Sequence, residues 1–265
     1  MSATTWTGGP LSERATCVLA PNPGVMTLEG TNTWLLRAPG GSDVVVVDPG
    51  PADDGHVSRV LQAAAADGGR VALVLLTHHH RDHAGAAEAI AGPTGAPVRG
   101  GGHGALADGE RVDLADLSVE VLATPGHTAD SVSFLLRADG LLLTGDTVLG
   151  RGTSVLAWPD GNLTDYLRSL DRLAAAVREG LVSRIAPGHG PAVDDPAGVL
   201  SGLRQHRLTR LQEIRSAVEG GADDVDELVT AVYGTHLGAD RRRAATMSVR
   251  AQLDHLGIVL DREPG

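Results

Sequence analysis

The stretch VALVLLTHHHRDH, residues 71–83, decides the fold of this chain. Its first six residues are apolar and predict a buried strand, and four histidines and one aspartate follow within seven positions. The segment AGAAEAIAG that comes next predicts a helix. The polar cluster therefore lies in a loop between a strand and a helix, where functional residues collect in an α/β scaffold.

The polar cluster has the spacing of metal ligands, H-x-H-x-D-H, formed by His78, His80, Asp82 and His83. In a tight loop, His78 and His80 can point the same way and hold one metal, and Asp82 and His83 then face a second metal beside it. We expect His79 and Arg81, at the x positions, to point away. Imidazole and carboxylate ligands suit zinc, with manganese and iron as alternatives.

Two metals need more ligands than one loop supplies, and three lone candidates follow later strands. ATPGHT places His127 after one predicted strand, LLLTGDT places Asp146 after another, and IAPGHG places His189 after a third. Each lies in a glycine-containing turn at the end of a strand. All three can therefore meet the first loop at one edge of the sheet.

The apolar pattern predicts an α/β catalytic domain over residues 1–195 and a helical module over 196–265. The strands expected in the first part cover 33–37, 43–48, 71–76, 117–124, 131–137, 141–145 and 182–188, with helices over 55–66 and 162–179. After residue 195 the pattern is helical only, in segments 198–220, 223–234 and 241–257.

Composition limits the classes of function. The net charge of −11 argues against non-specific binding to nucleic acid or to an anionic membrane. Cys17 is the single cysteine, so neither an internal disulfide nor a cysteine-based zinc knuckle can form. No apolar stretch is long enough to span a bilayer and the N-terminus has no signal-peptide pattern, so we expect a cytoplasmic protein. The oligomeric state stays open.

With these ligands the chain resembles the metallo-β-lactamase superfamily from about residue 16 to 195. The resemblance implies an αββα sandwich that binds two Zn²⁺ per chain, with Mn²⁺ or Fe²⁺ as alternatives. It implies one metal on His78, His80 and His127, the other on Asp82, His83 and His189, and Asp146 as the bridge between them. DVVVVDPG looks like the first motif of the family, in which Asp48 steadies the metal loop without binding metal.

Further segments resemble a β-lactamase-like subgroup that includes a mitochondrial endoribonuclease and polyketide-type thioesterases. These segments are PNPGVMTLEGTNTWLL, GDTVLGRGTSV, the helix around DYLRSL and the helical C-terminal part. The resemblance implies that the C-terminal module is winged-helix-like, with SVRAQLDHLGIVL as its final helix and following strand.

Two metals roughly 3.5 to 4 Å apart can share a water and lower its pKa toward 7. The resulting bridging hydroxide is the expected nucleophile, and Asp82 is expected to orient it or accept its proton as well as binding metal. No serine or cysteine nucleophile is required. The sequence thus predicts a binuclear metallo-hydrolase.

Four functions remain open, because the ligands determine the nucleophile and not the substrate. The first is hydrolysis of single-stranded RNA or another phosphodiester, although six Phe, Tyr and Trp residues in all (one, two and three) leave few side chains to stack on bases. The alternative is a thioesterase of the glyoxalase II kind, acting on a small ester or thioester. A third treats the nearly neutral C-terminal module as a nucleic-acid or partner-binding unit. Antibiotic hydrolysis is expected least, because the commonest zinc β-lactamases have cysteine where this chain has Asp146.

Other polar residues have weaker signals. Asn32 is a predicted substrate contact, with a turn or strand-pairing role as the alternative. Thr153 and Ser154 are predicted substrate contacts too and Trp158 belongs with them, with ordinary loop roles as the alternative. The run Arg241 to Arg243 either binds phosphate or is a solvated helix face. No catalytic role is expected for four histidines, His56, His206, His236 and His255. The glycine-rich GGGHGA around His103 has no phosphate-loop context, and a flexible connection is expected there.

Overall fold

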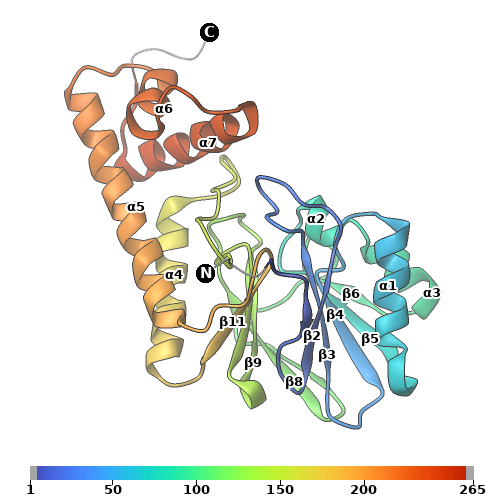
Figure 1. Ribbon diagram of the computed structural model, residues 1–265. Helices are drawn as coiled ribbons and strands as arrows, with labels where there is room; N and C mark the ends of the chain where they lie inside the picture. The colour runs from blue at the N-terminus through green and yellow to red at the C-terminus, as the bar shows by residue number, and fades with distance from the viewer. Residues whose placement is uncertain (1–4, 261–265) are drawn as a thin grey trace.

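Two β-sheets pack face to face and carry helices on their outer faces in the computed structural model, which describes residues 5–260 (Figure 1). This αββα arrangement confirms the predicted α/β fold class. Two short 3-10 helices lie in connections: η1 (Ala66–Gly68) between α1 and β5, and η2 (Arg137–Asp139) between β9 and β10. No helix in this part of the chain is long and apolar enough to cross a membrane.

The first sheet has six strands in the order β1-β2-β3-β4-β5-β6. Its strands are β1 (Gly9–Pro10), β2 (Ala15–Leu19), β3 (Asn32–Arg37), β4 (Asp43–Val47), β5 (Arg70–Leu75) and β6 (Val98–Arg99). Strands β1 to β4 pair antiparallel, whereas β4, β5 and β6 run parallel. The parallel strands end at the same edge, so the loop that follows β5 lies at that edge.

The second sheet has five strands in the order β11-β10-β9-β8-β7. Its strands are β7 (Arg111–Leu114), β8 (Leu117–Ala123), β9 (Val132–Leu136), β10 (Leu141–Gly145) and β11 (Arg184–Pro187). Only β10 and β11 pair in parallel. Their ends and the end of β8 point to the same side of the sandwich, so the turns with His127, Asp146 and His189 follow at one edge.

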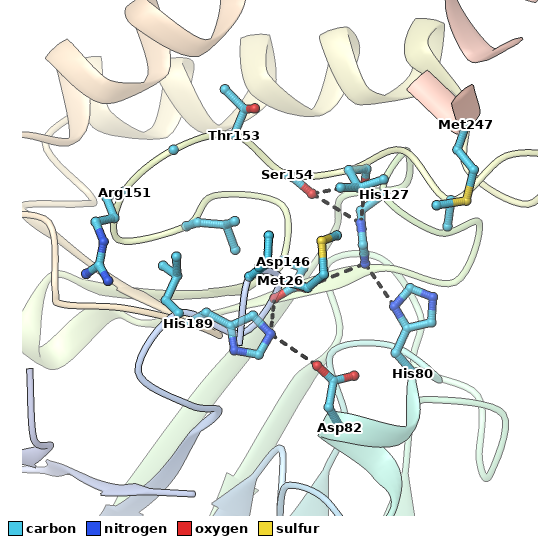
Figure 2. Close-up of a pocket in the computed structure, with 16 residues that line it drawn as sticks. Met26, His80, Asp82, His127, Asp146, Arg151, Thr153, Ser154, His189 and Met247 are labelled. Carbon is cyan, nitrogen blue, oxygen red and sulfur yellow. Dashed lines mark hydrogen bonds and ion pairs between the residues drawn. The ribbon is translucent and has the colours of Figure 1, made fainter. Parts of the chain in front are cut away.

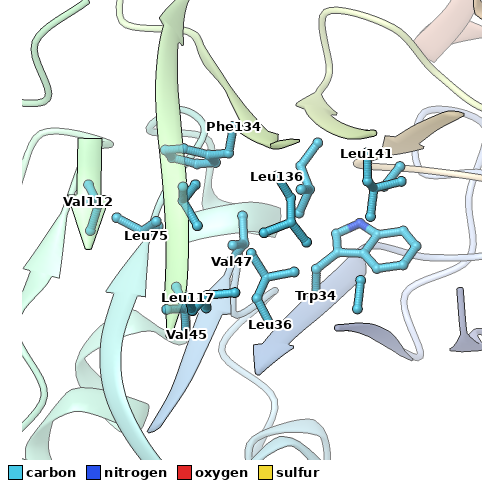
Figure 3. Packing of buried hydrophobic residues seen from close by; sticks show 14 of the residues in the cluster. Trp34, Leu36, Val45, Val47, Leu75, Val112, Leu117, Phe134, Leu136 and Leu141 are labelled. Atoms are coloured by element: carbon cyan, nitrogen blue, oxygen red, sulfur yellow. The ribbon is translucent and has the colours of Figure 1, made fainter. Parts of the chain in front are cut away.

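The inner faces of the sheets form the main core (Figure 3). Trp34, Leu36 and Val47 from the first sheet pack against Phe134 and Leu136 from the second, and all are at most 2% exposed. Alternate residues along each strand face this core, which follows from the two-residue period of a β-strand. The two sheets are therefore held together by continuous apolar packing.

Helices cover the outer faces. The first sheet carries α1 (Asp54–Ala64) and α3 (Ala87–Thr94), and the second carries α4 (Leu163–Arg178), whereas the single-turn α2 (Arg81–Ala84) lies at the edge where β5 ends. Asp53 and Asn162 cap α1 and α4 through side-chain oxygens that accept backbone N–H groups. The predicted helices over 55–66 and 162–179 are thus present within two residues at either end.

The C-terminal module consists of α5 (Pro196–Glu219), α6 (Val225–Tyr233) and α7 (Ala239–Leu256). Ile214, Leu228 and Val249 are buried in a small core of its own. By contrast, Leu200 and Leu203 of α5 belong to the cluster that also contains residues of α4. The boundary predicted near residue 195 coincides with the start of α5, and the division into two domains stays a prediction.

One expectation for the C-terminal module is wrong. The strand expected after the final helix is absent from residues 257–260: α7 ends at Leu256, Gly257 follows in a left-handed conformation, and residues 258–260 pair with no strand of the described part. The remaining residues, 261–265, lie outside the described part.

Candidate metal centre

Seven histidine and aspartate side chains meet at the edge of the sandwich where β5, β8, β10 and β11 end. The first loop leaves β5 at Leu75 and turns at once into α2, whose first helical residue is Arg81. His78 and His80 therefore precede the helix, and Asp82 and His83 lie within its single turn. This change of backbone direction divides the four side chains between two neighbouring groups.

The first group contains His78, His80 and His127. His80 Nδ1 lies 3.1 Å from His78 Nε2 and 3.0 Å from His127 Nε2. Two ligands of a tetrahedral zinc at Zn–N of 2.0 to 2.1 Å stand about 3.3 Å apart. The three nitrogens thus converge at nearly the spacing that one cation requires.

The second group contains Asp82, His83 and His189. The Nε2 atoms of His83 and His189 lie 3.2 Å apart. Asp82 Oδ2 lies 3.3 Å from His189 Nε2 (Figure 2). The two imidazoles are at most 1% exposed, whereas a third of the Asp82 side chain is accessible. Asp82 is therefore the member of this group that meets the solvent of the pocket.

Asp146 lies between the two groups. Its Oδ1 atom is 3.3 Å from His83 Nε2 and 3.4 Å from His189 Nε2, and Oδ2 is 3.7 Å from His127 Nε2. Oδ1 is buried and has no hydrogen-bond partner. A buried carboxylate oxygen without a donor, directed at imidazole nitrogens, fits a cation better than a hydrogen-bond network.

A carboxylate behind the ligands orients one of them. Asp48 Oδ2 lies 2.9 Å from His83 Nδ1 and also accepts the hydroxyl of Thr77, while Oδ1 accepts the Thr77 backbone N–H. His83 Nε2 is consequently left to face the group of ligands. The positive φ of 51° at Asp48 turns the chain directly after β4 and brings the carboxylate under the loop.

Backbone carbonyls orient two further imidazoles. His127 Nδ1 donates to Val155 O at 2.5 Å and also lies 3.1 Å from Ser154 Oγ. His189 Nδ1 donates to Gly30 O at 3.1 Å. In both rings Nε2 is then free to bind a metal, the arrangement in which metal-binding histidines occur.

Burial and mutual repulsion prepare the first group for a cation. Burial, followed by the neighbouring imidazoles, holds the pKa of His78 well below its usual range and lowers that of His80 to about 4. Burial also lowers the pKa of His127. These rings are neutral at pH 7, the form that binds metal.

The second group holds protons as ion pairs when no metal is bound. Burial opposes the charge on His189, but Asp146 and Asp82 outweigh it and raise the pKa of His189 to about 9. For His83, likewise, Asp146 and Asp48 outweigh burial and raise the pKa well above its ordinary value. A metal that binds here must displace these protons.

The donor set therefore fits divalent cations, with imidazole nitrogens and carboxylate oxygens at ligand spacing and with no sulfur donor. The geometry brings together all seven residues predicted as ligands, and Asp48 contacts the loop that carries four of them.

A cavity of about 380 Å³ opens over the centre (Figure 2). His80, Asp82, His127, Asp146 and His189 form its floor. Most of the remaining lining is apolar, with Val25, Met26, Leu28, Leu149 and Met247 in contact with it. Histidine is the only ring-bearing residue in the lining, and Arg151 is the only arginine.

The predicted substrate contacts have different positions. Thr153 and Ser154 line the cavity. Asn32 does not, because it is fully buried and its amide donates to Pro187 O and Gly190 O while its oxygen accepts from Trp6. Its prediction as a substrate contact is wrong: the side chain of Asn32 hydrogen-bonds β3 to the turn that carries His189.

Other side chains with sequence signals also lie outside the cavity. Trp158 Nε1 donates to Asp254 of α7, and its ring lies under Arg250. His79 is exposed and pairs with Asp130, so it points away from the ligands as expected. Arg81 is exposed as well. His103 lies in a turn between β6 and β7.

Sequence reasoning missed most of the apolar lining. Val25 and Met26 are exposed and lie in a proline- and glycine-rich loop. Two adjacent apolar residues in such a loop were the available signal. Met247 had no signal, since it lies in the helical pattern of α7, far along the chain. Arg151, paired with Glu29 at 2.8 Å, was hidden in a glycine-rich turn.

The family model of the metallo-beta-lactamase superfamily matches residues 26–108 and 105–189. These segments contain all seven clustered residues and Asp48. The chain belongs to the metallo-beta-lactamase superfamily, whose members are generally hydrolases.

Among named relatives, a "Beta-lactamase-like protein 2 homolog" of Caenorhabditis elegans is 33% identical over 218 residues, which is 77% of this chain and 70% of the relative. An "Atrochrysone carboxyl ACP thioesterase" of Aspergillus fumigatus is 30% identical over 250 residues, 84% of this chain and 75% of the relative. In fold, a crystal structure of a beta-lactamase domain protein from Burkholderia ambifaria has a TM-score of 0.82 at 22% identity, covering 96% of this chain and 90% of its own.

Proposed function

We propose that this protein is a hydrolase with two divalent metals that cleaves a small ester or thioester with an apolar acyl group. The observation that carries the proposal is the apolar lining of the cavity directly over the seven clustered side chains. Met26, from the loop before β3, and Met247, from α7, both line the cavity (Figure 2). Methionine side chains adapt to varied apolar shapes. The thioesterase name of the Aspergillus relative supports the same substrate class.

Each group of the site has a role in this proposal. His78, His80 and His127 hold one cation, Asp82, His83 and His189 hold the other, and Asp146 lies between them. When bound, the two cations supply an activated water and polarise the carbonyl under attack. Asp82, the accessible carboxylate of the site, would orient such a water and accept its proton.

Single-stranded RNA, the first substrate expected from the sequence, has less support from the cavity. RNA-binding grooves combine basic side chains with aromatic rings that stack on bases. The lining has one arginine, Arg151, whose charge is already paired with Glu29. No particular contact favours RNA, so it serves as the competing arm of the test.

The test is an activity panel on protein whose metal content has been measured. We expect turnover of short-chain acyl thioesters, and no cleavage of an unstructured oligoribonucleotide, of bis-p-nitrophenyl phosphate or of a cephalosporin. Asp82→Asn should reduce kcat by at least a hundredfold while the protein still folds, and Asp130→Asn, outside the cavity, serves as the matched control. Cleavage of the oligoribonucleotide with no thioester turnover would overturn the proposal.

A further inference from the structure

Arg207 of α5 is a buried cation without a counter-ion. Its side chain is 2% exposed, and among residues 5–260 no carboxylate forms an ion pair with it. Nη2 donates to Ser154 O, the guanidinium carbon lies 4.9 Å from the centre of the Tyr166 ring, and Nε has no hydrogen-bond partner. Neutral partners of this kind compensate only part of the cost of removing a charge from water.

Arg207 lines a cavity of about 300 Å³ between α5, α7 and the loop 153–155, which we call the tail cavity. This cavity is also lined by His206, Arg241, Thr153 and Ser248, and no acidic residue is among its lining residues. Arg241 is exposed at its edge and has no ion pair within the described part of the chain. The lining is therefore cationic and rich in donors.

The electrostatics of a neighbour agree with this description. Burial, and next the positive charges of Arg207 and Arg210, lower the pKa of His206. Glu213, which pairs with Arg210, opposes this effect, so the positive potential at His206 comes first from Arg207. An anion entering the tail cavity would reduce this potential.

The tail cavity adjoins the cavity over the metal centre. The two share Thr153, Ser154 and Val155 as lining residues, and α7 contributes Met247 to one and Ser248 to the other. The loop 153–155 thus lies between the two cavities, and a substrate that reaches past it would place its apolar part over the clustered ligands and a polar part at the tail cavity.

We propose that the tail cavity binds an oxyanion, a phosphate or a carboxylate, carried by the leaving group of the substrate. This inference rests on the proposed function and narrows it to substrates whose thiol or alcohol is itself anionic. A guanidinium presents paired N–H groups that match both kinds of oxyanion, and the hydroxyls of Thr153 and Ser248 add single donors. The anion supplies the counter-charge that Arg207 lacks.

Kinetics on matched thioesters test the proposal. The same short acyl group is presented on pantetheine, on pantetheine 4′-phosphate and on glutathione, so that the leaving group is neutral, phosphorylated or carboxylated. We expect KM to be at least tenfold lower for one of the two anionic thioesters than for the neutral one, with a similar kcat. Arg241→Gln should remove most of that difference. Arg243→Gln, which removes an exposed arginine outside the tail cavity, should preserve it.

A binding measurement separates this inference from the proposed function. Calorimetry with the S-methyl thioethers of the same thiols needs no hydrolysis. One outcome is that the anionic thioether binds more tightly, with the difference abolished by Arg241→Gln, while no thioester is hydrolysed. That result supports anion binding in the tail cavity and contradicts the proposed function. If thioesters are hydrolysed but KM and affinity do not depend on the anion, or Arg241→Gln and Arg243→Gln behave alike, the inference is overturned. Arg207→Gln, checked for its melting temperature, provides a second variant.

Discussion

His79 and His80 are neighbours in the ligand loop, yet they face opposite environments. His80 Nδ1 lies between two other imidazole nitrogens, whereas His79 Nδ1 lies 2.9 Å from the carboxylate of Asp130 on the surface. The His79 side chain is 46% exposed. The direction of each ring therefore separates a candidate ligand from a surface residue.

Substitution of these two neighbours should have different effects on metal content. His80→Ala should reduce the metal bound after dialysis from two ions per chain to about one, because the first group then keeps only two imidazoles beside Asp146. His79→Ala should retain both ions, because it removes a surface hydrogen bond only. Elemental analysis of the two purified variants measures this, and equal loss from both would contradict the assignment.

His56 is a buried histidine that supports the metal loop from outside the centre. Thr33 Oγ1 donates its hydrogen to Asp48 O, so His56 Nε2, 2.9 Å away, must be the donor to Thr33. Arg59 approaches Nδ1. Burial, and then the charge of Arg59, lower the pKa of His56 to about 4. The ring is consequently neutral in the folded protein.

Acidification should therefore destabilise the protein through His56. Its pKa is about 4 when folded and about 6.5 when unfolded, so its contribution to stability is present above pH 6.5 and is lost as the pH falls toward 4. Between pH 6.5 and 4.5, the free energy of unfolding should fall by about 2 kcal/mol more in the wild type than in His56→Gln. Urea titrations at both pH values measure the difference. Identical losses in the two proteins would show that His56 does not titrate on unfolding.

At the scale of single residues, the sequence predicts side chains that share one local pattern. The H-x-H-x-D-H spacing and three glycine turns at strand ends were sufficient to find all seven clustered residues. Asn32 was misjudged because its partners, Pro187 O and Gly190 O, come from a segment that only the folded sheet brings near. Arg207 was missed for a related reason, since a helical arginine has the pattern of a solvated residue until α5 buries it.

Among the elements, α5 connects the C-terminal module to the catalytic layers. Its Leu200, 1% exposed, and Leu203 lie in the same apolar cluster as Tyr166, Leu170 and other residues of α4 (Figure 1). This packing supplies the outer cover of the second sheet. The loop with Ser154, which contacts His127, is held from the other side by Arg207 of the same helix.

Removal of residues 196–265 should consequently damage the remaining domain. The truncated chain exposes the apolar face of α4, so we expect mostly insoluble protein or a melting temperature lower by more than 10 °C. In the full chain, Leu200→Ala alone should cost roughly 2 to 5 kcal/mol of stability, and Ser201→Ala at the exposed neighbouring position should cost little. A soluble, cooperatively folding and fully active 1–195 fragment would instead support an independent binding module.

Long apolar strands and capped helices could be predicted from the sequence, and short edge strands could not. β1 and β6 have two residues each, too few for a periodic pattern. β7, with the sequence RVDL, has one buried residue, Val112. β2 has the sequence ATCVL and follows a polar turn. β2, β6 and β7 form on the edges of β3, β5 and β8, and β1 forms on β2, which is a tertiary effect that local sequence does not encode.

For the molecule as a whole, the candidate metal centre lies where the two sheets meet at one end. Four of the seven clustered side chains follow β5 of the first sheet, and the other three follow β8, β10 and β11 of the second. The inner core holds the sheets together along their length, but at this end polar side chains replace apolar packing. Side chains from the two sheets lie within reach of one cation only in the folded protein. A cation bound there therefore favours the folded state over the unfolded one.

Metal removal should therefore lower the stability of the entire fold. A ligand that binds only the native state adds about 4 kcal/mol when its free concentration is a thousand times its Kd, which corresponds to roughly 10 °C in a chain of this size. Chelation should lower the melting temperature by about that amount, and stoichiometric zinc should restore it. His189→Ala, which removes a ligand contributed by the second sheet, should show a much smaller response, and Asp130→Asn the full one. A melting temperature that stays constant while elemental analysis shows loss of metal would mean that the cations do not join the sheets.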